Sequence, residues 1–243
     1  MIYIHDGNFD GFLSCVFEHY YNKKAEGIYS RDNYEPVLFQ EVLFIETDGE
    51  KAERVQQALI KKISTEAYIN IYYSFHSKNI HKDTKLLKYI ELAFKLKGRI
   101  DLLFTHELVA PVIDMKRKVS RERHLFLGIL RFSDAGTCLV AEIEPENDIL
   151  PLIAGHFADR LLKEQFLIYD KLRKKAVICR EGEWYIRDID LKDRIVFSKK
   201  EDYFQELWKE YFNRIGIESR QNLKLQQSFV PIKYRKNIVE FKQ

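Results

Sequence analysis

The C-terminal segment of this 243-residue chain combines cations, amides and aromatic rings with few acids. From Arg220 onward it carries six Lys or Arg residues and one acid, Glu240. Cations neutralise phosphates, and an aromatic ring can stack on an unpaired base. We therefore expect nucleic-acid contacts from Arg220, Lys224, Phe229, Lys233, Tyr234 and Arg235. The alternative is an arm that packs across its domain through Leu223, Leu225, Phe229 and Val230, with its cations merely solvated.

The densest basic run in the chain lies at 116–123. Its five cations are Lys116, Arg117, Lys118, Arg121 and Arg123, interrupted by one acid. Contact with a phosphate backbone is one interpretation of this run. The other is a solvated helix end and linker, because cations near a helix C-terminus also complement the helix dipole.

A third group of polar residues follows Pro151 at helical spacing. His156, Asp159, Arg160 and Lys163 are predicted to share the polar side of one helix. His156 could transfer a proton while Asp159 orients it, or it could bind a phosphate beside Arg160. The alternative is a histidine on the solvent side of the helix with an ordinary neighbour one turn away.

Two further pairs lie at the ends of predicted strands. Asp170 and Arg173 bracket a tight turn, and Asp170 is a candidate for chemistry, although hydrogen bonding within the turn accounts for its position. His5 and Asp6 end the first strand, where functional sites are common. A turn stabilised by the Asp6 side chain is the alternative there.

The chain lacks the spacings that mark several common sites. Its histidines form no HxH or HExxH pattern, and its three cysteines form no CxxC pair, so no metal or cofactor is expected. The glycine patterns of nucleotide-binding loops and the GxSxG nucleophile turn are absent too. No signal peptide or run of about 20 apolar residues occurs, so we expect a cytoplasmic protein without membrane contact.

The periodicity of apolar residues predicts an α+β fold, with an antiparallel sheet of about five to six short strands flanked by helices. The first half, 1–120, is predicted to be helix-rich, with two short strands at 2–5 and 41–46 and a helix capped by Asn8. Helices are also expected around 52–63, 86–94 and 100–115.

The second half, 121–243, is predicted to hold the antiparallel sheet, further helices and the basic C-terminal arm. Strands are expected at 125–132, 137–143, 166–169, 176–179 and 184–189, the first two forming a hairpin. Helices are expected after Pro151 and after Ser198. A single continuous domain is the alternative to this division.

Three separated motifs of the chain carry a resemblance to known proteins. The first is Tyr3-Ile4-His5-Asp6-Gly7-Asn8-Phe9-Asp10-Gly11-Phe12-Leu13. The second is Ile149-Leu150-Pro151-Leu152-Ile153-Ala154-Gly155-His156-Phe157-Ala158-Asp159-Arg160 with Phe166-Leu167-Ile168-Tyr169-Asp170. The third runs from Leu207-Trp208-Lys209-Glu210-Tyr211-Phe212 through Arg220 to Tyr234. Together these motifs resemble a bacterial family of probable DNA metabolism proteins, a domain of unknown function, and the resemblance covers essentially the whole chain.

The resemblance implies a partner, because members are typically encoded beside a putative radical SAM protein of DNA modification or repair. Related domains are fused to uracil-DNA glycosylase-like domains. The reaction would then belong to the partner, since this chain has no cluster-binding cysteines. The leading hypothesis is an accessory protein that binds single-stranded or damaged DNA. The alternatives are an enzyme acting on DNA or nucleotides with His156 as acid or base, and a protein-interaction scaffold without direct DNA contact.

Overall fold

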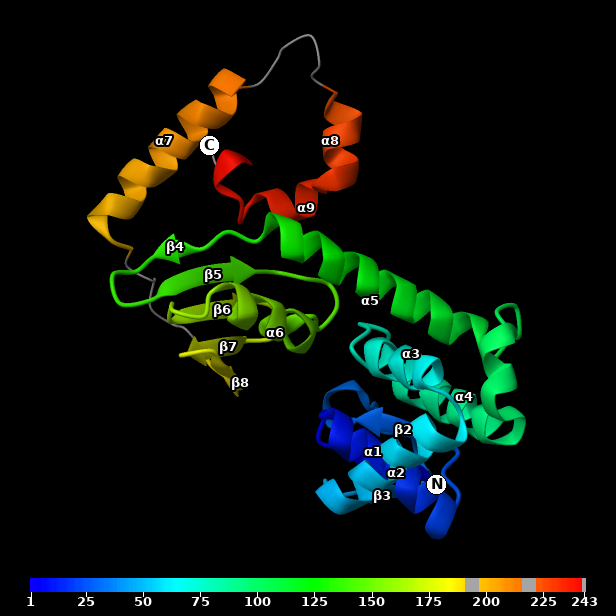
Figure 1. The fold of residues 1–243 in the computed structure, drawn as a ribbon. Coiled ribbons are helices and arrows are strands. Elements are labelled where there is room, and N and C mark those ends of the chain that lie inside the picture. Colours follow the sequence, from blue (N-terminus) through cyan, green and yellow to red (C-terminus); the bar gives the residue numbers. More distant parts are fainter. Residues whose placement is uncertain (191–196, 216–221, 242–243) are drawn as a thin grey trace. The chain divides into compact units, whose positions relative to one another are not determined.

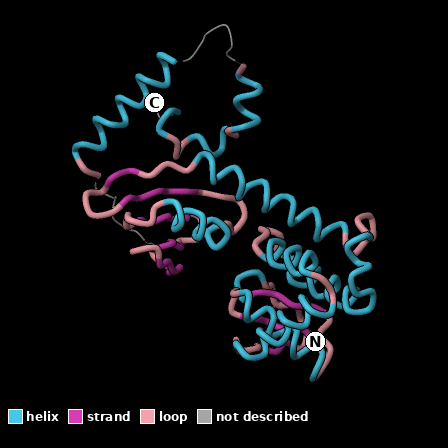
Figure 2. Tube along the Cα trace, viewed as in Figure 1, coloured by secondary structure: helices cyan, strands magenta, loops and turns pink. Residues whose placement is uncertain are grey.

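A computed structural model of the protein describes residues 1–190, 197–215 and 222–241. The chain divides into two compact units, Met1–Ser120 (unit 1) and Arg121–Gln243 (unit 2), and the division falls within helix α5 (Ala110–Ile129). The strands form two separate sheets, one in each unit (Figures 1 and 2).

Unit 1 is built on a three-stranded parallel sheet with β1 (Ile2–His5) between β2 (Gly27–Ser30) and β3 (Val42–Phe44). The helix between β1 and β2 returns the chain to the same end of the sheet, which a parallel pair requires. Strands lie at both predicted places, as β1 and β3, and the prediction missed β2, whose four residues Gly27–Ser30 begin with glycine and end with serine and so give only a weak strand pattern. The helices of this unit are α1 (Phe9–Tyr21), η1 (Arg31–Asn33), α2 (Gly49–Lys62), α3 (Thr65–Phe75), α4 (Lys82–Leu96) and η2 (Lys97–Leu102).

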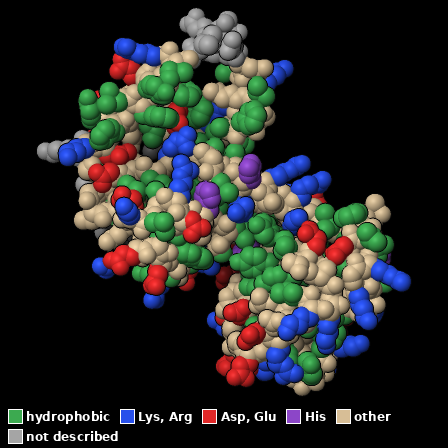
Figure 3. Space-filling view, in the orientation of Figure 1, with side chains coloured by type: hydrophobic (Ala, Val, Ile, Leu, Met, Phe, Trp, Pro, Cys, Tyr) green, Lys and Arg blue, Asp and Glu red, His purple; other side chains and the backbone are tan. Residues whose placement is uncertain are grey.

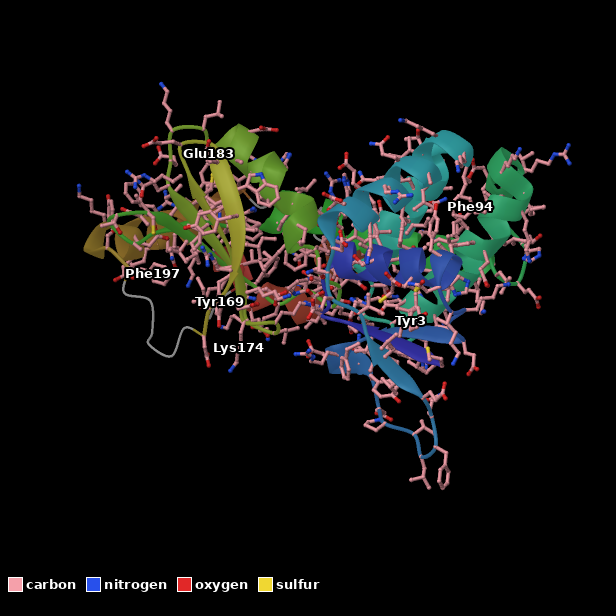
Figure 4. All side chains as sticks on the ribbon, turned by 90° about the horizontal axis from the view of Figure 1, so that it is seen from below. Tyr3, Phe94, Tyr169, Lys174, Glu183 and Phe197 are labelled. Atoms are coloured by element: carbon pink, nitrogen blue, oxygen red, sulfur yellow. The ribbon has the colours of Figure 1, made fainter. Side chains whose placement is uncertain are left out.

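Local side-chain chemistry sets the starts of the first helices. The Asn8 side chain accepts a hydrogen bond from the Gly11 amide at 2.6 Å, which confirms the predicted cap of α1. Asp48 caps α2 in the same way, accepting from the amides of Glu50 and Lys51 at 3.0 and 3.1 Å. These caps fix the starts of two helices that contribute side chains to the core of unit 1, to which Tyr3 of β1, labelled in Figure 4, also belongs.

Unit 2 contains a five-stranded sheet in the order β4-β5-β6-β7-β8. Its elements are β4 (Ser133–Asp134), β5 (Leu139–Ile143), α6 (Leu150–Arg160), β6 (Phe166–Asp170), β7 (Lys175–Arg180), β8 (Glu183–Asp188), α7 (Lys199–Ile215), α8 (Leu223–Phe229), α9 (Ile232–Arg235) and η4 (Val239–Phe241). The prediction of an entirely antiparallel sheet was wrong, because β5 and β6 are parallel. Helix α6 connects them as a crossover, whereas tight turns make the β6-β7-β8 pairs antiparallel.

Two other predictions around α5 were also wrong. The expected strand at 125–132 is mostly helical, because α5 continues to Ile129 and only Ser133–Asp134 pair with β5. Short apolar runs do not distinguish a strand from a buried helix segment, and Phe126 is buried on such a segment. The expected helix at 100–115 is replaced by η2 and the first turns of α5.

The C-terminal part of unit 2 begins with α7, at the position predicted after Ser198. The Ser198 hydroxyl accepts from the Glu201 amide at 3.3 Å, and the Glu201 carboxylate accepts from the Asp134 amide at 2.9 Å. The first bond caps α7, and the second joins α7 to β4. Much of the apolar side of α7 is nevertheless exposed, and apolar side chains gather over α7 and α8 (Figure 3). None of the helices in the described part of the chain is both long and apolar enough to cross a bilayer.

Candidate nucleic-acid interface

The first half of the basic run lies on α5 within unit 1 and is paired with carboxylates. Lys116 Nζ lies 3.4 Å from Glu66 Oε1. Arg117 and Lys118 both contact Asp114, at 2.9 and 2.7 Å. Exposed ion pairs contribute only about 0–1 kcal/mol, but each cancels local charge. A phosphate would have to displace a carboxylate to reach these cations.

The second half of the run lies in unit 2 and makes different contacts. Arg121 is exposed and has no ion pair in the described parts of the chain. Arg123 Nε donates to the Leu152 carbonyl oxygen at 2.9 Å, which brings α5 to α6 one helical turn before His156. This contact supplies a cation beside the polar side of α6.

Glu122, the acid within the basic run, is buried and holds three segments together. Its carboxylate accepts from the Glu146 amide at 2.7 Å, and from the Asn147 amide and side chain at 2.8 and 2.6 Å. The Tyr234 hydroxyl donates to the same carboxylate. A buried carboxylate is tolerated when its lone pairs are satisfied in this way. From the sequence alone, Glu122 was only an acid that interrupts a run of cations.

Tyr234 lies in the core of unit 2. Only 6% of the residue is exposed, and its ring centroid lies 4.9 Å from that of Phe126. Burial and the hydrogen bond to Glu122 raise the pKa of Tyr234 above its ordinary value. In this position the ring stabilises the fold and presents no face for a base. The packing alternative for the C-terminal arm named other residues, and of these Leu223, Leu225 and Phe229 are exposed.

The C-terminal cations mostly have partners. Lys233 is paired with Glu146, and Lys236 is paired with Glu144. The guanidinium of Arg235 lies 4.4 Å from the Phe241 ring centroid, and Arg235 Nε donates to the Val230 carbonyl oxygen at 3.0 Å. Of the other predicted contacts, Lys224 and Phe229 are exposed on α8, and Arg220 lies outside the described residues.

The predicted polar side of α6 is present and faces solvent. His156, Asp159 and Arg160 are all exposed on this helix, and Lys163 is exposed shortly after it. Within the residues that the structure describes, no hydrogen bond joins the His156 ring to Asp159, and none of these four side chains has an ion pair. The arrangement suits a phosphate contact, and it lacks the orienting hydrogen bond expected for a histidine base.

Asp170 is fully buried at the turn between β6 and β7, near Tyr169 and Lys174 in Figure 4. Its carboxylate accepts from the Leu172 amide at 2.9 Å and from the Arg173 guanidinium at 2.8 Å. Arg173 also donates to the Pro145 carbonyl oxygen at 3.0 Å, which ties the turn to the β5-α6 connection. Burial raises the pKa of Asp170, although Arg173 opposes this effect. These contacts are those of a structural turn.

Unit 1 contains a buried ionic cluster that the sequence did not reveal. His5 Nε2 lies 3.3 Å from Asp83 Oδ2, and Lys82 Nζ lies 2.8 Å from Asp83 Oδ1. Burial alone raises the pKa of Asp83, but His5 and Lys82 outweigh it, so the pKa lies below its ordinary value. Asp83 is 78 residues from His5 in the sequence, so no local pattern relates them. Among the described residues, no group of three His, Cys, Asp or Glu side chains is arranged to hold a metal ion.

Unit 1 also contains a cleft that sequence reasoning missed. Aromatic side chains of α1 and α4 and cations of α2 line it. The spacing of Phe17 and Tyr21, four residues apart, is a signal for adjacent rings on one helix, but it is equally typical of a core-facing stripe.

Comparison with known proteins gives one match. Residues 81–240 match the DUF4130 family, which is described as a domain of unknown function. No curated protein and no solved structure matches the sequence. The matched residues include Asp83, α5 and α6, whereas β1, α1 and α2 precede them.

Proposed function

We propose that this protein, which belongs to the DUF4130 family, is a DNA-binding accessory component of DNA modification or repair. In this proposal it binds single-stranded or damaged DNA and acts beside a radical SAM protein that performs the reaction. The resemblance of the three sequence motifs supports the DNA context and the radical SAM partner. The matched family itself is one of unknown function.

The observation that carries the DNA-binding part is a set of cations on α5, at the end of α6 and just after it that have no ion pair among the described residues. Arg121, Arg160 and Lys163 are exposed and lack ion pairs in the described parts of the chain, and Arg123 joins the two helices. A phosphate can contact such cations without displacing a carboxylate, and their counterions are released on binding. This favours α5 and α6 over the C-terminal cations as the principal backbone contact.

The salt dependence of binding tests this proposal. The affinity for a fluorescein-labelled oligothymidylate is measured by anisotropy between about 50 and 200 mM salt. Each neutralised phosphate of a single strand contributes about 0.7 to the slope of log K against log salt. Replacing Arg121, Arg160 and Lys163 together with alanine is expected to reduce the slope by about 2. An unchanged slope, or no binding by the wild-type protein, rejects the proposal.

The exposed apolar side of α7 favours a second function, docking of a protein partner. Trp208 and Tyr211 are exposed there, their ring centroids 5.6 Å apart, and exposed aromatic clusters are typical of interaction surfaces. The radical SAM protein implied by the resemblance is the proposed occupant. Replacing Trp208 with alanine is expected to weaken co-purification of that protein while DNA affinity stays unchanged. Full retention of the partner by this variant rejects the docking role of α7.

A further inference from the structure

The cleft in unit 1 lies between α1 and α2, and Phe94 of α4 contributes to its wall (Figure 4). Its volume is about 770 Å³. Pockets that bind small molecules and cofactors commonly measure about 300–1,000 Å³ and are lined mainly by apolar and aromatic side chains. The cleft therefore has the size and the lining of a ligand site.

Four aromatic rings line this cleft. The rings of Phe17 and Tyr21 are stacked, with centroids 4.3 Å apart and planes inclined by 18°. Tyr20 and Phe94 meet edge to face with centroids 5.4 Å apart. Tyr21 is 66% exposed, so an aromatic surface in the cleft remains open to solvent. Exposed rings of this kind are the platforms on which proteins stack unpaired bases.

The cations of the cleft come from α2. The Arg54 guanidinium lies 5.0 Å from the Phe17 centroid and 5.5 Å from the Tyr21 centroid, so it extends over the stacked rings. Lys61 and Lys62 also line the cleft, where the single acid is Glu53. In the part of the chain that the structure describes, Arg54, Lys61 and Lys62 form no ion pair.

We propose that this cleft binds a nucleotide, with its base stacked on the exposed Tyr21 ring, which packs on the buried Phe17 ring, and with its phosphate held by Arg54, Lys61 or Lys62. A planar base matches the rings, and a phosphate matches the three cations. An apolar ligand would leave those cations without a counter-charge. The ligand comes from an unpaired base in a DNA strand or from a free nucleoside monophosphate. The first source rests on the proposed DNA-binding function, and the second does not.

Tyr20 also lines the cleft, and its hydroxyl is a further polar group there. Burial, with a smaller effect of the Glu91 carboxylate, raises the pKa of Tyr20 to about 12, although 46% of the residue is exposed. The hydroxyl therefore stays protonated at neutral pH and can donate a hydrogen bond to a base or a phosphate.

Binding of two probes by the full chain tests the proposal, and the variants are Tyr21→Ala and Tyr21→Phe. The probes are a fluorescein-labelled oligothymidylate and ethenoadenosine monophosphate. Replacing a stacked aromatic residue with alanine lowers the affinity for the base by about 5- to 150-fold. We expect that loss for Tyr21→Ala with at least one probe, whereas Tyr21→Phe retains wild-type affinity.

The Arg31–Phe44 pair serves as a matched control in the same unit. The Arg31 guanidinium lies 5.7 Å from the Phe44 ring centroid, Phe44 is exposed, and neither residue lines the cleft. Phe44→Ala is expected to bind both probes like the wild type. Because Tyr21 is largely exposed at the end of α1, Tyr21→Ala should fold, which an unchanged circular dichroism melt verifies.

The outcomes separate this inference from the proposed function. Loss of oligothymidylate binding in Tyr21→Ala identifies an unpaired base as the ligand. Loss confined to ethenoadenosine monophosphate identifies a free nucleotide, and this result stands even if no oligothymidylate binds. Affinities of Tyr21→Ala within twofold of wild type for both probes, or a wild-type protein that binds neither, overturn the inference. An equal loss in Phe44→Ala also overturns it. The proposed function is tested separately, by the effect of the combined Arg121, Arg160 and Lys163 replacement on the salt dependence of oligothymidylate binding.

Discussion

Two regions of the chain combine cations with aromatic rings, and they differ in what those groups contact. In the cleft of unit 1, Arg54 lies over the buried Phe17 ring and the exposed Tyr21 ring, and it lacks a carboxylate partner among the described residues. In the C-terminal segment of unit 2, Lys233 is paired with Glu146 and Tyr234 is buried against Glu122. Similar residue types are therefore available to a ligand in the first region, whereas Lys233 and Tyr234 are committed to contacts within the fold in the second.

The difference teaches that the partners of a cation matter more than its place in a basic run. The acids that pair with the C-terminal cations, Glu144 and Glu146, lie about 90 residues earlier in the chain, on the connection from β5 to α6. A count of charges within the segment does not include them. The same reasoning separates Arg121, which has no ion pair within the described part of the chain, from Lys118, which contacts Asp114.

The largest expected effect concerns the buried ion pair that stabilises unit 2. Replacing Arg173 with methionine leaves the Asp170 carboxylate buried without its partner, and is expected to lower the free energy of unfolding by about 3–5 kcal/mol. Urea denaturation followed by tryptophan fluorescence measures this, because Trp184 and Trp208 both lie in unit 2.

A matched control for this change lies two residues earlier. Lys171 pairs with Glu142 at 3.4 Å on the surface, so Lys171→Met is expected to cost less than about 1 kcal/mol. Equal losses for the Lys171 and Arg173 variants would contradict the structural role of the Asp170–Arg173 pair.

The next largest effect tests whether Tyr234 stabilises the fold or contacts a ligand. Tyr234→Phe removes the hydrogen bond to the buried Glu122 carboxylate and is expected to cost about 1.5–3 kcal/mol of unfolding free energy. DNA affinity should stay unchanged, because the hydroxyl that the change removes donates to Glu122 and is not available to a ligand. The control is Tyr211→Phe, since Tyr211 is exposed. A stable Tyr234→Phe protein with reduced DNA affinity would reverse the comparison between the two regions.

A pH-dependent effect of similar size is expected in unit 1. Because the folded-state pKa of Asp83 is lowered, its contribution to stability is present above the unfolded pKa, near 3.8, and is lost as the pH falls through the folded pKa. Asp83→Asn should therefore lower stability by about 1.5–3 kcal/mol at neutral pH. That difference should shrink below about pH 4.

Hydrogen exchange of unit 1 peptides measures how the stability difference depends on pH. The opposite pH dependence is expected for Asp170, which lies in unit 2. Its folded-state pKa is raised, so the stability that it contributes is present below the unfolded pKa and lost as the pH rises through the folded pKa. A difference between wild type and Asp83→Asn that stays constant from neutral pH to pH 3 would contradict the assigned role of Asp83.

Local signals in the sequence were sufficient for much of the secondary structure. Asn8 and Ser198 mark the starts of α1 and α7, because the cap and the residues it contacts are sequence neighbours. The direction of β6 relative to β5 was not accessible in this way, because it depends on how α6 crosses the sheet. The strand expected at 125–132 failed because a short apolar run fits a buried helix equally well.

The candidate site was predicted less well than the fold, because its contacts join residues that are far apart in the sequence. The exposed positions of His156 and Arg160 follow from the helical spacing after Pro151. The burial of Tyr234 and the pairing of Lys233 depend on residues 112 and 87 positions away. The cleft was missed because rings at helical spacing are usually core residues, and exposure of Tyr21 is a property of the fold.

The smallest expected effect is that of the paired C-terminal lysines on the salt dependence of DNA binding, which should hardly change. Replacing Lys233 and Lys236 with alanine should leave the salt dependence of oligothymidylate binding within about 0.7 of the wild-type slope, because both cations are already paired. Anisotropy titrations at several salt concentrations measure the slope. A decrease of about 1.4, the full contribution of two phosphate contacts, would mean that these pairs open for DNA.

Photo-crosslinking tests the central claim most directly, because it reports which residues contact the strand. A single-stranded oligonucleotide containing 4-thiothymidine is bound to the full chain, irradiated and mapped by mass spectrometry. We expect crosslinked peptides from α1, with Tyr21, and from α6, with His156 and Arg160. Crosslinks confined to the α9 region, at Lys233 to Lys236, would contradict the account.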